Sequence, residues 1–566
     1  MNKFSRERVK GFLHTDGRRM VNGDGEVVVL RGFGVGNWMN PEGFMIGGVP
    51  LFPEFGKFDE FSLPRRFERG RTMESTVREL CGTAYAREFA WKWYGSYLSE
   101  GDIKLMAELG YNSVRLPISA RLFLAEEPGI QWVEEGFAIL DKVLNWCEKY
   151  HIYAILDMHG APGGQSALAC DDGIDNMPHM FTEPESRERA MLLWEEFARR
   201  YKDRWIVGGY DLLNEPISGP HTRQYMPQLI SFYDEVIERI RRIDQNHMLT
   251  LEGNVFSMDM EIFDHAYDPE CNNWCIHIHY YNFSPEIRSL YRFLDKSLQF
   301  NVPIWIGEGG SDEVSNSVFY EIAGSLDIGW ALWSWKKAAD PKGDGRAAVE
   351  YPLPEGWDQM REYIRYGGPR PSYEESKKIL DQMLENLKIE HCTVNEEYNH
   401  YNVRRPGIRI PAVGFDQGSS KGKGWMYGNV LGFRTEDGMK LPLRPGVKPP
   451  VKGLPIMGEP VRESDPLKDL CLELSKGEKA AYTIRDVEKE CKVSFSARTV
   501  QGMEDGPCKI LVYCVDEAGK RLDAEVEICG VETREYPVKV LTSGSRWTVE
   551  IEVSEGCVQL DEVSFL

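Results

Sequence analysis

Two glutamates interrupt short apolar runs at points where a carboxyl group could enter a binding site. Glu215 lies in LLNEP (212–216), and Glu308 lies in IGEGG (306–310). Retaining glycoside hydrolysis needs two carboxyl groups that face each other, because one attacks the anomeric carbon and the other gives and later takes a proton. The sequence therefore predicts this chemistry, provided that the fold brings the two glutamates together.

Short apolar, β-branched runs alternate with helical patterns over most of the first part of the chain. Eight runs have the character of strands: 27–35, 112–118, 152–158, 207–213, 248–252, 275–280, 302–306 and 328–335. Apolar residues recur with the period of a helix at 101–110, 137–150, 190–201 and 229–242, whereas the connection after 252 lacks such a pattern. This alternation predicts an α/β fold, a closed (β/α)8 TIM barrel, with an open doubly wound sheet as the alternative.

Active sites of such barrels lie at the carboxyl ends of the strands. Six predicted strands carry polar or aromatic side chains there: Arg115, His159, Asn214 with Glu215, His277 with His279 and Tyr281, Glu308, and Trp333 with Trp335. A guanidinium at Arg115 would keep Glu308 ionised and favour it as the nucleophile, which leaves Glu215 as the acid/base. Strict strand alternation would send Asn214 and Glu215 to opposite faces, so we expect a bulge there.

LLNEP and IGEGG resemble the acid/base and nucleophile motifs of glycoside hydrolase family 5, over about residues 10–390. The resemblance implies a barrel, a retaining mechanism and no cofactor or metal. It also implies that Asn214 bonds the sugar 2-hydroxyl and that Tyr281 contacts Glu308. The further substrate-binding residues that it implies are Arg115 from VRLPI, His159 from DMHG, His279 from HYY, and a platform tryptophan, Trp335, from WSWK.

The segments GVGNWMNPE (34–42) and LDMHGAPGGQ (156–165) resemble those of the family's fungal-type exo-β-1,3-glucanases. That likeness implies substrate contacts at Trp38 and Glu42, with Glu42 holding the hydroxyls of the non-reducing sugar. It favours an exo-acting β-glucosidase, and the expected absence of export favours small glycosides as its substrates. An endo-β-glucanase and a non-catalytic glycan-binding protein are the alternatives, transglycosylation stays open, and the linkage is not predicted.

The chain is expected to hold two domains. The catalytic barrel would span 1–395, with an inserted cap at about 43–100 and a closing helix at 372–389. From 396 to 566, alternating segments such as 480–487, 492–500, 509–515, 546–553 and 558–566 predict a β-sandwich. The Pro- and Gly-rich stretch 440–458 is a linker or a loop of that sandwich. The sandwich resembles carbohydrate-binding modules of families 6 and 35, and either sugar binding or a structural role fits.

The amino-acid composition limits the classes of partner that the chain is expected to bind. Lys and Arg number 67 and Asp and Glu 89, so 67 − 89 gives a net charge of −22, which disfavours nucleic acid and anionic membranes. The 12 cysteines are scattered with no CxxC pair, and the first 20 residues lack the apolar stretch of a secretory signal, so we expect reduced thiols in the cytoplasm. His277 and His279 have no third metal ligand at suitable spacing, and the glycines at 32, 34 and 36 do not fit a dinucleotide loop.

Overall fold

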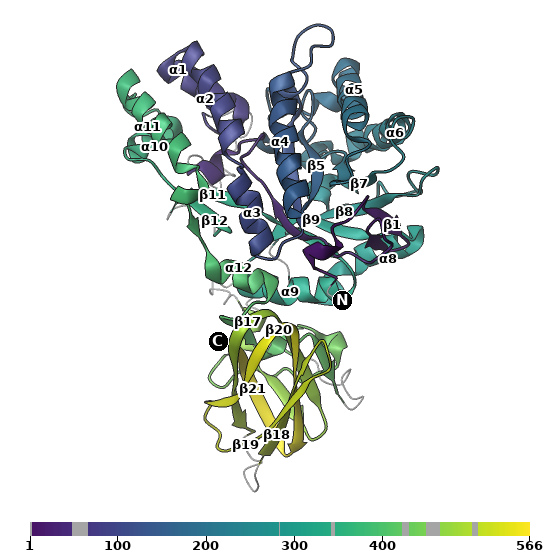
Figure 1. Ribbon diagram of the computed structural model, residues 1–566, viewed down its shortest axis with the longest axis vertical. Coiled ribbons are helices and arrows are strands. Elements are labelled where there is room, and N and C mark those ends of the chain that lie inside the picture. The colour runs from purple at the N-terminus through teal and green to yellow at the C-terminus, as the bar shows by residue number, and fades with distance from the viewer. Residues whose placement is uncertain are drawn as a thin grey trace, which may run out of the picture. The chain divides into compact units, whose positions relative to one another are not determined.

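The structure is a computed structural model that describes residues 3–47, 66–281, 284–340, 346–420, 429–448, 464–500 and 508–566. The chain forms two compact units (Figure 1). The first comprises Met1–Tyr281, Arg292–Gly310 and Asp327–Asn395. The second comprises Asn282–Tyr291, Ser311–Leu326 and Glu396–Leu566, so two short segments from within the barrel sequence belong to it.

The first unit contains a closed barrel of eight parallel strands, as predicted. Its strands are β3 (Arg31–Gly34), β4 (Ser113–Ser119), β5 (Tyr153–Gly160), β6 (Val207–Asp211), β7 (Met248–Glu252), β8 (Trp274–Tyr281), β9 (Ile304–Gly310) and β10 (Gly329–Trp333). β10 pairs with both β3 and β9, which closes the barrel. Nearly every residue in these strands is buried, because helices cover the outside and side chains fill the inside.

The helical patterns correspond to α3 (Glu100–Glu108), α4 (Glu134–Tyr150), α5 (Pro184–Tyr201) and α6 (Thr222–Arg241). The connection after β7 holds only the single-turn α7 (Asn254–Ser257), as its sequence suggested. α3 begins where Ser99 and Asp102 form a capping box, which satisfies backbone donors that a helix start leaves open. The other helices of these sequences are α8 (Tyr291–Phe300), α9 (Glu313–Ser325), α10 (Trp357–Tyr366) and the predicted closing helix α11 (Tyr373–Asn386).

The insertion between β3 and β4 contains η2 (Gly43–Ile46), α1 (Gly70–Cys81) and α2 (Thr83–Ser96). The helix expected near 84–97 is α2, and residues 48–65 of the proposed cap lie outside the described residues. Arg69, just before α1, is buried and donates hydrogen bonds to the carbonyl oxygens of Gly173 and Asp175. The insertion is therefore bound to the loop that follows β5, at the end of the barrel where a site is expected.

The second unit is an antiparallel all-β region. Its strands are β14 (Ile408–Pro411), β15 (Gln417–Ser419), β16 (Leu472–Ser475), β17 (Lys479–Thr499), β18 (Cys508–Asp516), β19 (Arg521–Ile528), β20 (Arg534–Glu555) and β21 (Cys557–Phe565). They pair in the order β14-β21-β17-β20-β18-β19, with β15 on β17 and β16 on β21. The predicted segments 480–487 and 492–500 form one long strand, β17, whose pairing with β20 is irregular between Val487 and Glu490.

One hydrophobic core fills the second unit, and Val318 and Ile322 of α9 are part of it. This burial explains why a helix from the barrel sequence belongs to the all-β unit. Of the stretch 440–458, Lys440 and Leu443 form single β-bridges with Glu473 and Leu470. That part therefore belongs to the all-β unit, while 449–458 lies outside the described residues.

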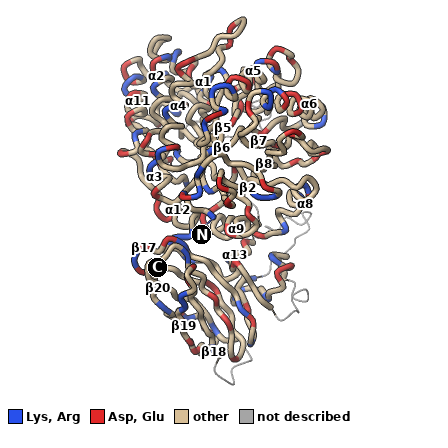
Figure 2. Tube along the Cα trace, turned by 45° about the vertical axis from the view of Figure 1, so that its right-hand side comes forward, with Lys and Arg blue, Asp and Glu red and all other residues tan. Residues whose placement is uncertain are grey.

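The remaining strands and α-helices of the described residues are β1 (His14–Asp16), β2 (Arg19–Val21), β11 (Lys336–Ala339), β12 (Val349–Pro352), β13 (Thr393–Val394), α12 (Glu396–Val403) and α13 (Pro466–Asp469). Acidic and basic residues are interspersed along the traces of both units (Figure 2). None of the described helices combines the length and the apolar composition that a membrane crossing requires.

Candidate active site

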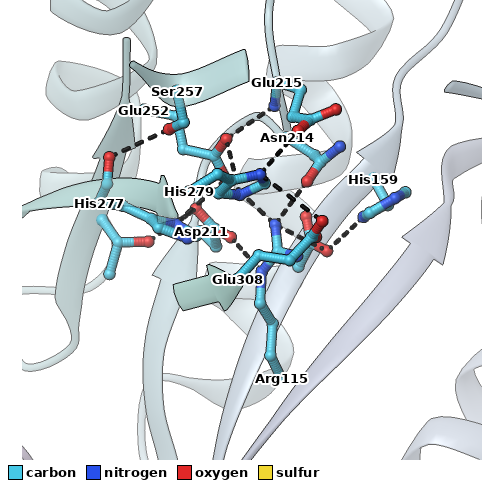
Figure 3. A network of polar contacts seen from close by, with 12 residues as sticks. Arg115, His159, Asp211, Asn214, Glu215, Glu252, Ser257, His277, His279 and Glu308 are labelled. Atoms are coloured by element: carbon cyan, nitrogen blue, oxygen red, sulfur yellow. Dashed lines mark hydrogen bonds and ion pairs between the residues drawn. The ribbon is translucent and has the colours of Figure 1, made fainter. Parts of the chain in front are cut away.

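Arg115 of β4 is fully buried and connects the polar ends of several strands (Figure 3). Its Nη1 donates to Oε2 of Glu308 at 2.7 Å, its Nη2 to Oδ1 of Asn214 at 2.7 Å, and its Nε to Oδ2 of Asp211 at 2.8 Å. One planar guanidinium thus binds three acceptors from the ends of two strands, β6 and β9, which its forked donors permit. It sets the positions of both halves of the predicted site.

Glu308 is held as a carboxylate. Besides Arg115, it accepts a hydrogen bond from the hydroxyl of Tyr281 at 2.6 Å, and Nδ1 of His279 lies 3.7 Å from Oε1. Burial raises the pKa of Glu308, but the charges of His279, Arg115 and His159 and the Tyr281 bond outweigh it, so the pKa lies below its usual value. An ionised, desolvated carboxylate suits a nucleophile. The predicted contact between Tyr281 and Glu308 is present.

Glu215 follows β6 and adopts a left-handed backbone conformation, with φ of 38°. Its backbone N–H donates to Oε2 of Glu252 at 2.7 Å, and its Oε1 accepts from Nδ1 of His279 at 2.8 Å. The thiol of Cys170 lies 3.9 Å from Oε2. Because the strand has already ended at Asp211, a left-handed residue, rather than a bulge within the strand, lets Asn214 and Glu215 serve one site.

The two glutamates approach each other closely. A carboxylate oxygen of Glu215, one of Glu308 and a ring nitrogen of His279 all lie within 4.8 Å of one another. Retaining glycosidases hold their carboxyl groups about 5–5.5 Å apart, whereas inverting enzymes leave about 6.5–9.5 Å for a water molecule. The close approach therefore suits direct attack by one carboxylate.

Three further side chains offer polar or aromatic contacts beside this pair. His159 is oriented by Asp157, whose Oδ2 lies 2.8 Å from its Nδ1, and its Nε2 lies 3.9 Å from Oε1 of Glu42. Burial raises the pKa of Glu42 well above its usual value, and the charges of Glu308 and Glu215 add to this. Among the described residues, neither Oε1 of Glu42 nor Nδ2 of Asn214 has a hydrogen-bond partner. Buried polar atoms of this kind call for a ligand.

Two predicted substrate contacts need correction. Trp335 is fully buried, its Nε1 donates to Oδ1 of Asp102 at 3.0 Å, and its ring packs on Phe33. The half-buried Trp333 instead stacks on His159, with ring centroids 5.2 Å apart and planes 2° apart. β10 ends at Trp333, so strand alternation no longer fixes the direction of Trp335.

Trp38 is also fully buried, and its Nε1 donates to the carbonyl oxygen of Tyr94 in α2 at 2.8 Å. It fastens the insertion to the barrel and does not line the site. Glu42, four residues later, does reach His159, so the segment that carries both residues delivers only one of them to the site.

The sequence reasoning missed Glu252 and Asp211. Glu252 ends the apolar run MLTLE of β7, and its carboxylate lies 3.1 Å from Nη2 of Arg115 and 3.1 Å from Nδ1 of His277. Asp211 ends β6 and contacts the same two side chains. The signal that singled out the other residues, an acid at the end of an apolar strand, was present in both.

Two groups of side chains come close enough to share a cation: Glu252 with His277 and His279, and Glu215 with His279 and Glu308. Glu252 is thus the third possible ligand beside His277 and His279 that the sequence did not reveal. However, the ring of His277 faces the backbone, since a Cβ built on Gly307 would lie 2.0 Å from its Nε2. Within the two groups His279 bonds to Glu215 and lies at ion-pair distance from Glu252 and Glu308, and His277 lies at that distance from Glu252, so the arrangement works as a network of paired charges.

Comparison with known proteins agrees with this geometry. A family model described as cellulase (glycosyl hydrolase family 5) matches residues 73–339. A β-xylosidase of Phanerodontia chrysosporium is 29% identical over 360 residues, which are 57% of this chain and 71% of that protein. Endoglucanase C of Acetivibrio thermocellus is 28% identical over 194 residues, 34% of this chain and 53% of the relative.

A probable glucan 1,3-β-glucosidase A of Emericella nidulans is 30% identical over 216 residues, 38% of this chain and 48% of the relative. The matches thus span about half the length of the last two relatives. Residues 73–339 of this chain are therefore a glycoside hydrolase domain of family 5, a family of retaining β-glycosidases.

Proposed function

We propose that this chain is a retaining, exo-acting β-glycosidase that releases a single sugar, glucose, from small β-glucosides or oligosaccharides. The observation that carries the proposal is the pair Glu215 and Glu308, whose carboxylate oxygens lie within 4.8 Å while Arg115 and Tyr281 hold Glu308 ionised. No step of this chemistry requires a cofactor.

The reaction proceeds in two displacements. In the first, an Oε atom of Glu308 bonds to the anomeric carbon, the bond to the leaving oxygen breaks, and the proton of Glu215 passes to that oxygen. In the second, water attacks the same carbon, its proton passes to Glu215, and the ester bond to Glu308 breaks. Both carboxyl groups return to their starting states and the configuration is retained. An alcohol in place of water would give transglycosylation.

Support for exo action comes from Glu42. Its buried Oε1 has no partner among the described residues, so a sugar hydroxyl can bond to it. Such a group serves a site that ends at one sugar. The relatives named β-xylosidase and probable glucan 1,3-β-glucosidase also favour exo action. The β-xylosidase makes xylose the alternative to glucose as the released sugar. The relative named endoglucanase C favours endo action as the second candidate.

A panel of aryl β-glycosides and oligosaccharides tests the proposal. The wild-type chain should release glucose from an aryl β-glucoside and from the end of an oligosaccharide, with the β-anomer formed first. Glu308→Gln should lose at least about a thousandfold in kcat, while Glu374→Gln, on the exposed start of α11, should not change it. Full activity of Glu308→Gln would overturn the assignment, and a ladder of products would establish endo action.

The remaining roles are also proposals. We assign 1–395 to catalysis and 396–566 to a carbohydrate-binding-module-like domain, whose sugar binding an affinity gel can test. The cytoplasm is the proposed compartment. All 12 cysteines of the chain are free thiols in the structure, which supports a reducing environment.

A further inference from the structure

We propose that Glu252 is the positioning residue of the acid/base: it holds Glu215 in its reactive conformation from two directions. The inference rests on the proposed function, in which Glu215 protonates the leaving group. Glu252 stands at the end of β7 and is fully buried, and no hydrogen bond or ion pair among those that the structure describes joins it to Glu308.

The first direction is through the backbone. Oε2 of Glu252 accepts the N–H of Glu215 at 2.7 Å (Figure 3). Glu215 is left-handed there, with φ of 38°, a conformation that a non-glycine residue maintains only when its surroundings enforce it. A hydrogen bond to an ionised carboxylate is among the stronger ones in proteins. Glu252 thus fixes the turn that aims the Glu215 side chain into the site.

The second direction is through His279. Its Nε2 lies 3.3 Å from Oε2 of Glu252, and its Nδ1 lies 2.8 Å from Oε1 of Glu215. Burial lowers the pKa of His279, but the charges of Glu252 and Glu308 raise it well above its usual value. The raised pKa favours the charged ring, which bonds to Oε1 of Glu215 through Nδ1 and forms an ion pair, without a hydrogen bond, with Glu252 on the side of Nε2. The ring occupies Oε1 of Glu215 and leaves Oε2 to carry the proton for the leaving oxygen.

The alternative is that Glu252 has only a structural role, as one of several acids that neutralise the charge of Arg115. Asp211 offers the matched comparison, because it also contacts Arg115 and Nδ1 of His277 from the next strand. No contact joins Asp211 to Glu215 or His279 among those that the structure describes. A purely structural role predicts that Glu252→Gln and Asp211→Asn have the same effect on the kinetics, whereas a positioning role predicts that their effects differ.

The difference should appear in the dependence on the leaving group. 2,4-Dinitrophenolate departs without a proton, whereas phenolate needs the acid in the first displacement. The ratio of kcat/KM for 2,4-dinitrophenyl β-glucoside to that for phenyl β-glucoside therefore reports on acid catalysis alone. General acid catalysis contributes about 10²–10⁴-fold, so a misplaced acid should raise this ratio by about 10–100-fold.

The experiment measures this ratio for the full chain and for Glu252→Gln, Glu252→Asp, Asp211→Asn and Glu215→Ala. Glu215→Ala sets the upper limit. We expect both Glu252 variants to raise the ratio, because Gln removes the charge that raises the pKa of His279 and Asp is too short to reach the Glu215 N–H. Asp211→Asn should lower kcat/KM for both substrates by the same factor and leave the ratio unchanged.

An unchanged ratio in both Glu252 variants, or an equal rise in Asp211→Asn, would overturn the inference. Retained hydrolysis of the dinitrophenyl substrate shows that a variant has folded with a working Glu308. If Glu252→Gln does not fold, Glu252→Asp decides, since it keeps the buried charge. Failure of the proposed function looks different: the wild-type chain would then hydrolyse neither glucoside, or would do so independently of Glu308.

Discussion

The hydroxyl of Tyr281 donates a 2.6 Å hydrogen bond to Oε1 of Glu308, while Arg115 binds the other carboxylate oxygen. Both donors stabilise the ionised form, and burial keeps water from competing with them. The proposed nucleophile is therefore held as a carboxylate, and its protonation should set the acid limb of the activity profile.

Tyr281→Phe removes one donor from that carboxylate. The pKa of Glu308 should rise, so the acid limb of kcat/KM for an aryl β-glucoside should move to higher pH and kcat should fall about tenfold. Tyr150→Phe, which removes a hydroxyl bonded to Glu100 on the surface, is the control and should leave the profile unchanged. An unmoved acid limb in Tyr281→Phe would show that this bond does not tune the nucleophile.

Substitutions of Trp333 and of Trp335 should have opposite effects on KM and on the stability of the fold. Trp333→Ala removes the ring that stacks on His159, so KM should rise about tenfold while the melting temperature changes little. Trp335→Phe should leave KM unchanged but destabilise the fold by about 1–3 kcal/mol, because buried Asp102 loses the indole donor. Kinetics and thermal melting of both variants check this. A rise of KM in Trp335→Phe as large as that in Trp333→Ala would show that Trp335 is the tryptophan that packs on the sugar.

Gly307 must remain glycine. A Cβ at this position would lie 2.0 Å from Nε2 of His277, and the ring cannot retreat because it is buried and bonded to Asp211. Gly307→Ala should therefore destabilise the fold by about 3 kcal/mol or more, as judged by urea denaturation. Gly95→Ala in α2, with its nearest neighbour 4.0 Å away, should instead be neutral or slightly stabilising. Equal stability of the two variants would contradict the close packing at Gly307.

Asp172 fastens the insertion to the loop after β5. It accepts hydrogen bonds from the backbone N–H of Arg71 at 2.8 Å and from Nε of Arg121 at 2.6 Å. Burial raises its pKa, but these two arginines lower it by more, so the folded-state pKa lies below the usual value. Its contribution to stability is therefore fully present above the unfolded pKa of about 3.9 and is lost as the pH falls through the folded value.

Asp172→Asn should accordingly destabilise the chain by about 1–3 kcal/mol at pH 7, since it removes the buried carboxylate that binds Nε of Arg121 and the N–H of Arg71, while Glu74 and Glu126 still pair with the two guanidinium groups. The gap to wild type should shrink below about pH 4. Urea denaturation at pH 7 and below about pH 4 measures the difference in the free energy of unfolding between the variant and the wild type. The exposed Asp358→Asn is the control and should show no difference at either pH. A gap that is independent of pH would mean that the charge of Asp172 does not matter.

The amino-acid sequence by itself determined the barrel and the two glutamates. Eight buried parallel strands must be apolar, and the intervening helices need a 3.6-residue period, so local composition specified the order of elements. Glu215 and Glu308 stood out because a carboxyl group inside an apolar run needs a reason to be there. The same reasoning assigned Arg115, His159 and Tyr281 to strands, which the structure confirms, while their roles in the site stay predictions.

Only the tertiary structure decided which tryptophan stacks on His159 and what binds the backbone of Glu215. Alternation along a strand gives relative directions only while the strand lasts, and the chain leaves the strand pattern just after Trp333 and well before Glu215. The bond between Glu252 and the Glu215 backbone joins residues 37 positions apart. Contacts of that kind follow from barrel closure and the register of neighbouring strands, which no local pattern encodes.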